Sequence, residues 1–158
     1  MAFPAGRLHE PTGMDCFIFP KGMFQNLPSF GIGSADWDSW LVYWTRRRGI
    51  PVVDATGVIT IIHQNHDYSH YALGVNGVHG GPEYERNLKL AGSAFRMFTL
   101  EDADWVLDAD GPRRPALNRR TLVHRFSRLP AYYPVTTLMV KCALWSYSNS
   151  SRWRRRWE

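Results

Sequence analysis

Two aspartates stand where a carboxylate could act on a substrate hydroxyl group. Asp36 and Asp38 follow the glycine-containing run 31–33 and open a segment whose apolar spacing is helical. The dipole of a helix favours negative charge at its N-terminus, so a carboxylate there tends to stay ionised. An ionised carboxylate that faces a cleft can act as a general base and remove a hydroxyl proton. A capping role is the alternative, and the residue types alone favour it.

Histidines gather in the segment that follows residue 62. His63, His66 and His70 are spaced by three and four residues, just beyond an expected strand. Imidazole nitrogens at this spacing can converge on one divalent metal ion. No cysteine pair or zinc-finger spacing accompanies them, so a structural zinc site is not expected. An ordinary polar loop is the alternative interpretation, and from the residues alone it is the more common one.

Asp-x-Asp strings begin at Asp36, Asp102 and Asp108. Paired carboxylates of this kind can hold Mg²⁺ or Mn²⁺ against a diphosphate, but the pattern is short enough to arise by chance. The strings at Asp102 and Asp108 have the surroundings of a helix cap and of a turn. We therefore expect structural roles for those two strings.

The element that would position these two aspartates is a helix over residues 37–48, which begins directly after Asp36 and includes Asp38. Its apolar positions recur at helical spacing and predict one buried face: Trp37, Trp40, Leu41 and Trp44. Residues 46–48, all arginines, suit the negative C-terminal end of the helix dipole, and Gly49 can end the helix.

Strands and further helices are expected around this helix. Short runs rich in apolar or β-branched residues predict strands over three ranges: 14–19, 50–54 and 58–63. Residues 82–91 predict a short helix with proline in its first turn. Residues 99–106 predict another, with Thr99 as its cap and Asp102 three residues on. This mixture predicts an α/β fold in which a mixed sheet is flanked by helices.

Charge divides the chain near residue 112. Residues 1–112 contain 13 of the 14 acidic residues and 8 of the 19 basic ones, whereas residues 113–158 contain 11 basic residues and only Glu158. This asymmetry predicts an acidic body over residues 1–112 and a basic, aromatic, helical tail over residues 113–158. Within the tail, residues 117–129 and 135–147 are the expected helices.

The tail suggests an anionic partner. Residues 152–157 consist of four arginines and two tryptophans, and they follow the apolar segment 135–147. Residues 131–158 therefore suit an anchor on an anionic membrane surface, with tryptophan at the headgroup level and arginine toward the lipid charges. A solvated chain end is an equal alternative. Nucleic acid is a third partner class, which the acidic body opposes.

The remaining features bear on location. No stretch reaches the ~18 apolar residues that a membrane-spanning helix requires, and the first ten residues lack the apolar centre of a secretory signal. Cys16 and Cys142 match no metal or redox spacing, which favours two reduced thiols over one disulfide. We expect a cytoplasmic protein, with peripheral association at the inner face of the membrane.

Taken in order, several runs resemble the C-terminal, acceptor-side half of GT-A-type nucleotide-sugar glycosyltransferases (family-2-like). The runs are residues 13–21, 28–33, 37–41, 51–56, 62–68, 81–88 and 90–92. The likeness extends from residue 12 to about residue 105. The Trp-Asp-x-Trp element at residues 37–40 is also similar to the one that carries the catalytic base in N-acetylglucosaminyltransferases of N-glycan branching.

The resemblance implies a partial GT-A-like mixed sheet and transfer of a sugar from a nucleotide-sugar donor to a saccharide or lipid-linked acceptor. It implies these site residues: Asp38 as the base, His63 and His66 as ligands of Mn²⁺ or Mg²⁺, and Trp37, Trp40 and Asp36 as contacts to the substrate. The two tryptophans could equally belong to the core. Asp36 stands where a small residue such as glycine is expected.

The donor-binding half of such enzymes has no counterpart in these residues. In the family, the nucleotide pocket and its principal Asp-x-Asp precede the run that begins here at Gly13. A nucleotide sugar must be held in attack geometry to react, so we expect activity to require an N-terminal partner chain or further N-terminal residues. The alternative is a non-catalytic module derived from that fold, which binds a membrane surface or a partner.

Overall fold

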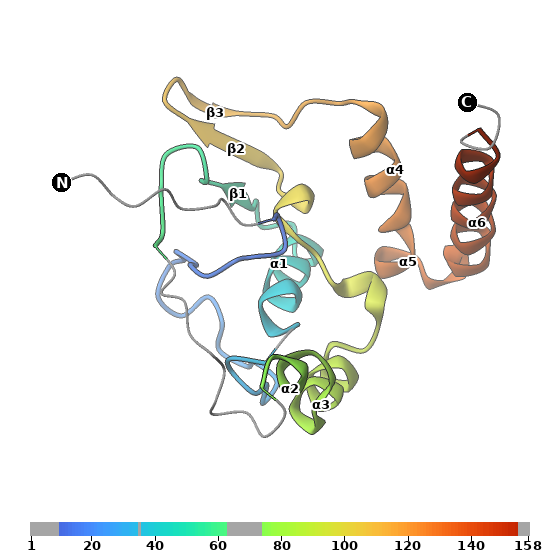
Figure 1. The fold of residues 1–158 in the computed structure, drawn as a ribbon. Coiled ribbons are helices and arrows are strands. Elements are labelled where there is room, and N and C mark those ends of the chain that lie inside the picture. Colours follow the sequence, from blue (N-terminus) through green and yellow to red (C-terminus); the bar gives the residue numbers. More distant parts are fainter. Residues whose placement is uncertain (1–9, 35, 63–73, 155–158) are drawn as a thin grey trace. The chain divides into compact units, whose positions relative to one another are not determined.

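The computed structural model describes residues 10–34, 36–62 and 74–154. The chain divides into two compact units, which meet along the sequence at Pro115 and Ala116. The charge distribution predicts this boundary three residues earlier, after residue 112. The first unit combines helices with a small sheet and the second is helical, so the fold is mixed α/β (Figure 1).

The first unit contains α1 (Trp37–Arg47), β1 (Val53–Asp54), α2 (Val75–Gly80), α3 (Pro82–Ala91), the 3₁₀ turns η1 (Ala94–Arg96) and η2 (Leu100–Asp102), β2 (Trp105–Asp108) and β3 (Gly111–Arg113). The second contains α4 (Arg119–Ser127), α5 (Leu129–Tyr132), the 3₁₀ turn η3 (Pro134–Thr136) and α6 (Thr137–Arg154). The helices expected over residues 37–48 and 82–91 are thereby confirmed.

The described residues form one mixed sheet in the order β1-β2-β3. β1 runs parallel to β2, with Val53 opposite Trp105, and β2 runs antiparallel to β3. Asp108 closes the β2–β3 turn, because it accepts hydrogen bonds from the backbone N–H of Asp110 (3.0 Å) and from Nε of Arg113 (2.6 Å). The turn role expected for the aspartate string at Asp108 is confirmed.

In the described part of the chain, three expected elements are absent and a fourth is shorter than expected. Residues 14–19 and 58–62 are irregular, and of residues 50–54 only the last two form a strand. The segment over residues 99–106 is not one helix: Thr99 and Asp102 do form the expected capping box, but the chain turns once and then enters β2. A run of apolar and aromatic residues is compatible with a strand, and equally with an irregular segment that packs on a helix. Residues 14–19 form an irregular segment of the second kind.

The core of the first unit is built on α1. Leu41 and Val42 are almost completely buried, and Tyr43 packs edge-on against the fully buried ring of Phe98 at a centroid distance of 5.4 Å. The irregular chain before α1 covers the tryptophan face with phenylalanine rings. Successive ring contacts, at centroid distances of 4.8 to 6.2 Å, join Phe19, Phe24, Trp44, Trp40 and Phe30.

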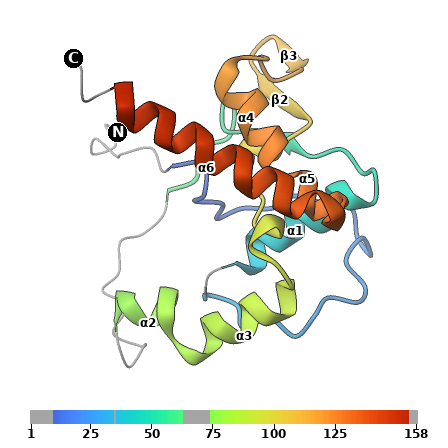
Figure 2. The ribbon, with the colours of Figure 1, turned by 90° about the vertical axis from the view of Figure 1, so that its right-hand side faces the viewer.

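The second unit is a helical hairpin, in which α6 returns alongside α4 after the short α5 (Figure 1). Asn118 caps α4 by accepting the backbone N–H of Thr121 (3.0 Å). The guanidinium of Arg119 lies over the ring of Tyr147, 5.3 Å from its centroid. Figure 2 shows α6 as one continuous helix. Among the described residues, no helix combines the length and apolar character that crossing a bilayer requires.

Asp104 joins the end of α1 to the sheet. Its carboxylate accepts a hydrogen bond from Nη2 of Arg46 (2.9 Å) and another from the backbone N–H of Val52 (3.0 Å). Arg46 also donates to the backbone carbonyl of Asp102. The aspartates of this second string therefore hold the fold together, because Asp102 caps η2 and Asp104 anchors α1.

Replacing Asp104 should destabilise the first unit. We expect Asp104→Ala to cost about 2 kcal/mol of unfolding free energy, since it removes two hydrogen bonds to a charged acceptor that is partly shielded from water. Urea unfolding followed by circular dichroism measures the loss. Asp108→Ala is the matched control, because it also loses an arginine partner but lies at an exposed turn, where ion pairs contribute little. Equal losses in the two variants would contradict this account of Asp104.

Candidate functional site

The loop that leads into α1 is fixed by one buried side chain. Asn87, on α3, is completely buried. Its Oδ1 accepts the backbone N–H of Gly31 (2.9 Å), and its Nδ2 donates to the carbonyl of the same residue (3.0 Å). The side-chain amide thus satisfies both backbone groups of Gly31, as a neighbouring strand would. We call this pair of hydrogen bonds the Asn87 clamp.

Weaker contacts flank the Asn87 clamp on both sides. Nη2 of Arg86 donates to Oγ of Ser29 (2.9 Å) at an exposed position. The hydroxyl of Ser34, which is buried, donates to the carbonyl of Val78 at 3.4 Å. Sequence reasoning did not single out Asn87; the available signal was an asparagine in the middle of a helix, where its propensity is poor. The Asn87 clamp therefore fixes the position of the loop that precedes Asp36.

Asp36 has a backbone conformation that favours glycine. Its φ of 81° lies in the left-handed region, which costs an ordinary L-residue roughly 1–2 kcal/mol. Gly33, three residues earlier, has a φ of 93°. Asp36 is the N-cap of α1 and its carbonyl accepts the N–H of Trp40 (3.1 Å), but its side chain makes no capping hydrogen bond. Glycine would adopt this backbone conformation without strain.

Asp38 is half-buried in the first turn of α1. Its Oδ1 accepts the backbone N–H of Ser39 at 2.7 Å. Burial raises the pKa of the Asp38 carboxyl above 3.8, and the negative charges of Asp36 and Asp15 raise it further, while the backbone hydrogen bonds oppose the shift. Desolvation thus outweighs the favourable N–H groups in setting the direction of this pKa shift.

The two tryptophans beside Asp38 have different surroundings. Trp40 is only 8% exposed, and its ring lies between those of Phe30 and Trp44, so it belongs to the core. Trp37 is half-buried and meets Phe17 at a centroid distance of 6.0 Å. Of the two rings expected to shape a sugar site, Trp37 is the one that retains an accessible surface.

The two expected metal ligands, His63 and His66, lie outside the described residues. The described part of the chain contains no group of three histidine, cysteine or acidic side chains placed to share a metal ion. Asp38 takes part in neither of the ion pairs that join Arg46 to Asp104 and Arg113 to Asp108. The Asp38 carboxyl and the half-buried ring of Trp37 are thus the candidate site that the structure describes.

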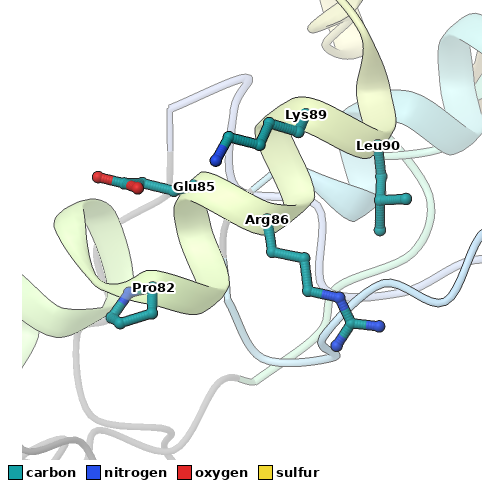
Figure 3. Close-up of a pocket in the computed structure, with 5 residues that line it drawn as sticks. All are labelled: Pro82, Glu85, Arg86, Lys89 and Leu90. Carbon is teal, nitrogen blue, oxygen red and sulfur yellow. The ribbon is translucent and has the colours of Figure 1, made fainter.

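Two surface hollows lie away from these residues. The larger, of about 460 Å³, is lined by α3 alone: Pro82, Glu85, Arg86, Lys89 and Leu90. Figure 3 shows the side chains of Glu85 and Lys89 on one side of this helix and that of Arg86 on another, as the i, i+4 spacing of the first two requires. The smaller, of about 200 Å³, includes Trp44 with the guanidinium of Arg48 over its ring at 4.0 Å. Neither hollow includes Asp38 or Trp37.

Comparison of the chain with protein-family models, with curated proteins and with solved structures gives no match.

Removing the Asn87 clamp should be costly. We expect Asn87→Ala to lower the unfolding free energy by about 3 kcal/mol, because it leaves two backbone groups of Gly31 without their partner at a cost of roughly 1–3 kcal/mol each when buried. Urea unfolding measures the loss, and amide hydrogen exchange at Gly31 should accelerate. Arg86→Ala, which removes the neighbouring exposed contact to Ser29, is the control and should change stability by less than about 1 kcal/mol. An Asn87→Ala loss no larger than that of Arg86→Ala would refute the clamp.

The raised pKa of Asp38 predicts a pH-dependent stability difference. A carboxyl group with a higher pKa in the folded state than in the unfolded state destabilises the fold once it ionises. Asp38→Asn should therefore be more stable than the wild type at pH 7, and the difference should diminish as the pH falls toward 3.8, the ordinary value. Asp15→Asn, which removes one charge at an exposed position, should gain less. Thermal unfolding across this pH range makes the comparison; a wild type that is more stable than Asp38→Asn at pH 7 would reverse the assigned sign.

Proposed function

We propose that the first unit is the acceptor-side part of a nucleotide-sugar glycosyltransferase with a partial GT-A-like fold, and that Asp38 is its catalytic base. One observation carries the proposal: a half-buried carboxyl group with a raised pKa lies in the first turn of α1, outside any described ion pair. A general base works best when its pKa approaches the working pH, and perturbed carboxyl groups are enriched at functional sites.

The chemistry of such a base is a proton transfer coupled to displacement. The acceptor hydroxyl oxygen forms a bond to the anomeric carbon of the donor sugar as the bond from that carbon to the nucleoside diphosphate breaks. The diphosphate leaves with the bonding electron pair, and the hydroxyl proton passes to the Asp38 carboxylate. A positioned base of this kind typically contributes about 10²–10⁴-fold in rate.

The surroundings of Asp38 suit a saccharide acceptor. A carboxylate can accept hydrogen bonds at several lone-pair positions, and the N–H of Ser39 occupies one of them. Trp37 is the adjacent residue in the same helix turn, and its half-buried ring offers an apolar surface beside this polar group. Sites that combine one apolar wall with a few placed polar groups suit small ligands with both kinds of surface. In this proposal Asp36 fixes the chain conformation at the start of α1 and lies beside the acceptor.

In this proposal, residues outside the described part of the first unit bind the nucleotide-sugar donor. In this proposal the nucleotide pocket comes from a partner chain or from additional N-terminal sequence, and Mn²⁺ or Mg²⁺ binds at His63 and His66. The metal would offset the charge of the departing diphosphate. Cys16 and Cys142 are both free and exposed, which supports a reducing compartment such as the cytoplasm.

Binding of acceptor saccharides to the chain itself tests this proposal. Titration of ¹⁵N-labelled protein with a panel of mono- and oligosaccharides should shift the amide signals of Asp38 and Ser39 and the indole signal of Trp37. Asp38→Asn should weaken the affinity about tenfold, because a charge-assisted hydrogen bond becomes a neutral one. Adding MnCl₂ with a nucleoside diphosphate should broaden signals next to residues 63–66.

The matched control is Asp15→Asn, which removes the same charge from an exposed residue near Asp38. It should leave saccharide affinity within about twofold and lower the pKa of Asp38, because one repulsive neighbour is lost. Saccharide-induced shifts that are absent, that map elsewhere, or that persist unchanged in Asp38→Asn would each exclude the proposed role of Asp38.

A further inference from the structure

One side of α6 exposes apolar side chains to solvent. Leu138 and Trp145 are 74% and 69% exposed, and Cys142, between them, is also exposed. These three residues follow one another at the spacing of four and three that places side chains on the same helix face. Met139, beside them, is 54% exposed, whereas Val140 is completely buried. We call Leu138, Met139, Cys142 and Trp145 the α6 stripe.

The exposure continues into the turn before α6. Val135, in η3, is 92% exposed and Tyr133, just before it, is 61% exposed. Isolated apolar side chains on a surface need no explanation, but several exposed ones within 13 residues of chain, 133–145, favour an interaction surface. α6 itself spans 18 residues and is not apolar enough to cross a bilayer.

The charge around the α6 stripe has one sign. Residues 111–157 contain no acidic residue. Exposed basic side chains lie on both long helices of the second unit, with Arg119, Arg120 and Arg125 on α4 and Lys141 within α6. In the sequence, four further arginines follow the stripe between residues 152 and 156. Each basic residue close to an anionic membrane contributes about 1 kcal/mol of attraction in general.

We propose that the second unit binds the surface of an anionic lipid bilayer, with the α6 stripe inserted at the level of the headgroups and the basic side chains facing the lipid charges. Apolar side chains of this size gain free energy when they leave water for the acyl boundary, and tryptophan is favoured at that depth. A nucleic acid would satisfy the charge but not the exposed leucine, methionine and valine, because binding of single strands depends on aromatic stacking and phosphate contacts. This proposal is independent of the glycosyltransferase assignment.

Vesicle flotation of the full chain tests the proposal. The protein should float with vesicles of phosphatidylcholine containing phosphatidylglycerol and should bind pure phosphatidylcholine vesicles at least about tenfold more weakly, because the electrostatic attraction is then absent. Raising the salt from 0.1 to 1 M should weaken binding to the anionic vesicles, since the Debye length falls from about 10 to about 3 Å.

A pair of double variants separates the α6 stripe from general surface apolarity. Leu138→Gln with Trp145→Gln should reduce binding to anionic vesicles at least about tenfold, because two apolar side chains no longer insert. Ile18→Gln with Ile32→Gln removes two side chains of similar exposure, 82% and 72%, from the first unit and should leave binding unchanged. Circular dichroism of each variant verifies that the helices are retained.

The two cysteines provide a readout that does not depend on mutation of the stripe. An environment-sensitive fluorophore on Cys142, in a Cys16→Ser background, should shift to the blue when anionic vesicles are added. The same fluorophore on Cys16, in a Cys142→Ser background, should not respond. Both thiols are exposed, so labelling without denaturant is itself expected.

Several results would overturn the proposal. These are absence of flotation with anionic vesicles, equal flotation of the two double variants, and a fluorophore at Cys142 that vesicles do not affect. Failure to label Cys142 in the native protein would show that another part of the chain covers the α6 stripe. Tight binding of a single-stranded oligonucleotide without binding to vesicles would assign the basic surface to nucleic acid instead.

Discussion

The Asn87 clamp is the constraint on which the candidate site depends. A buried asparagine whose amide pairs with both backbone groups of Gly31 costs little when both hydrogen bonds are made and a great deal when either is lost. The aromatic contacts that surround α1 are non-directional by comparison, since several ring arrangements bury similar area. The clamp therefore fixes where the loop arrives, and the rings of Phe30 and Trp40 then fill the space behind it.

The start of α1 departs from what stability alone would favour. Asp36 has a left-handed backbone where glycine would be unstrained, and Asp38 is desolvated beside two other carboxylates. Each feature raises the free energy of the folded state, and both fall within three consecutive residues. Departures from local consistency of this kind concentrate at functional sites. Substitutions at Asp36 and Asp38 would be a simple way to increase the stability of the fold if stability were the only requirement.

The sequence predicts secondary structure correctly where several physical signals agree. The helices at residues 37–48 and 82–91 were predictable because apolar period, charged ends and a proline in the first turn agree. Residues 14–19 were not, because phenylalanines that pack on a helix have the same composition as a buried strand. The Asn87 clamp could not be predicted from the sequence either, because it joins residues 56 positions apart and a single asparagine does not indicate its hydrogen-bond partner. The sequence singles out Asp38 as a candidate, but the upward shift of its pKa depends on burial, which the sequence does not specify.

The opposite charges of the two units constrain how the proposed activities can coexist. The first 115 residues hold 13 of the 14 acidic residues, whereas residues 116–158 hold nine basic residues and one acidic residue. An anionic bilayer attracts the second unit and repels the first, and both effects decay within a Debye length of about 8 Å at physiological salt. Surface binding through α6 therefore does not require the acidic unit to touch lipid. Such binding would also raise the local concentration of the first unit near any lipid-linked saccharide in the same membrane.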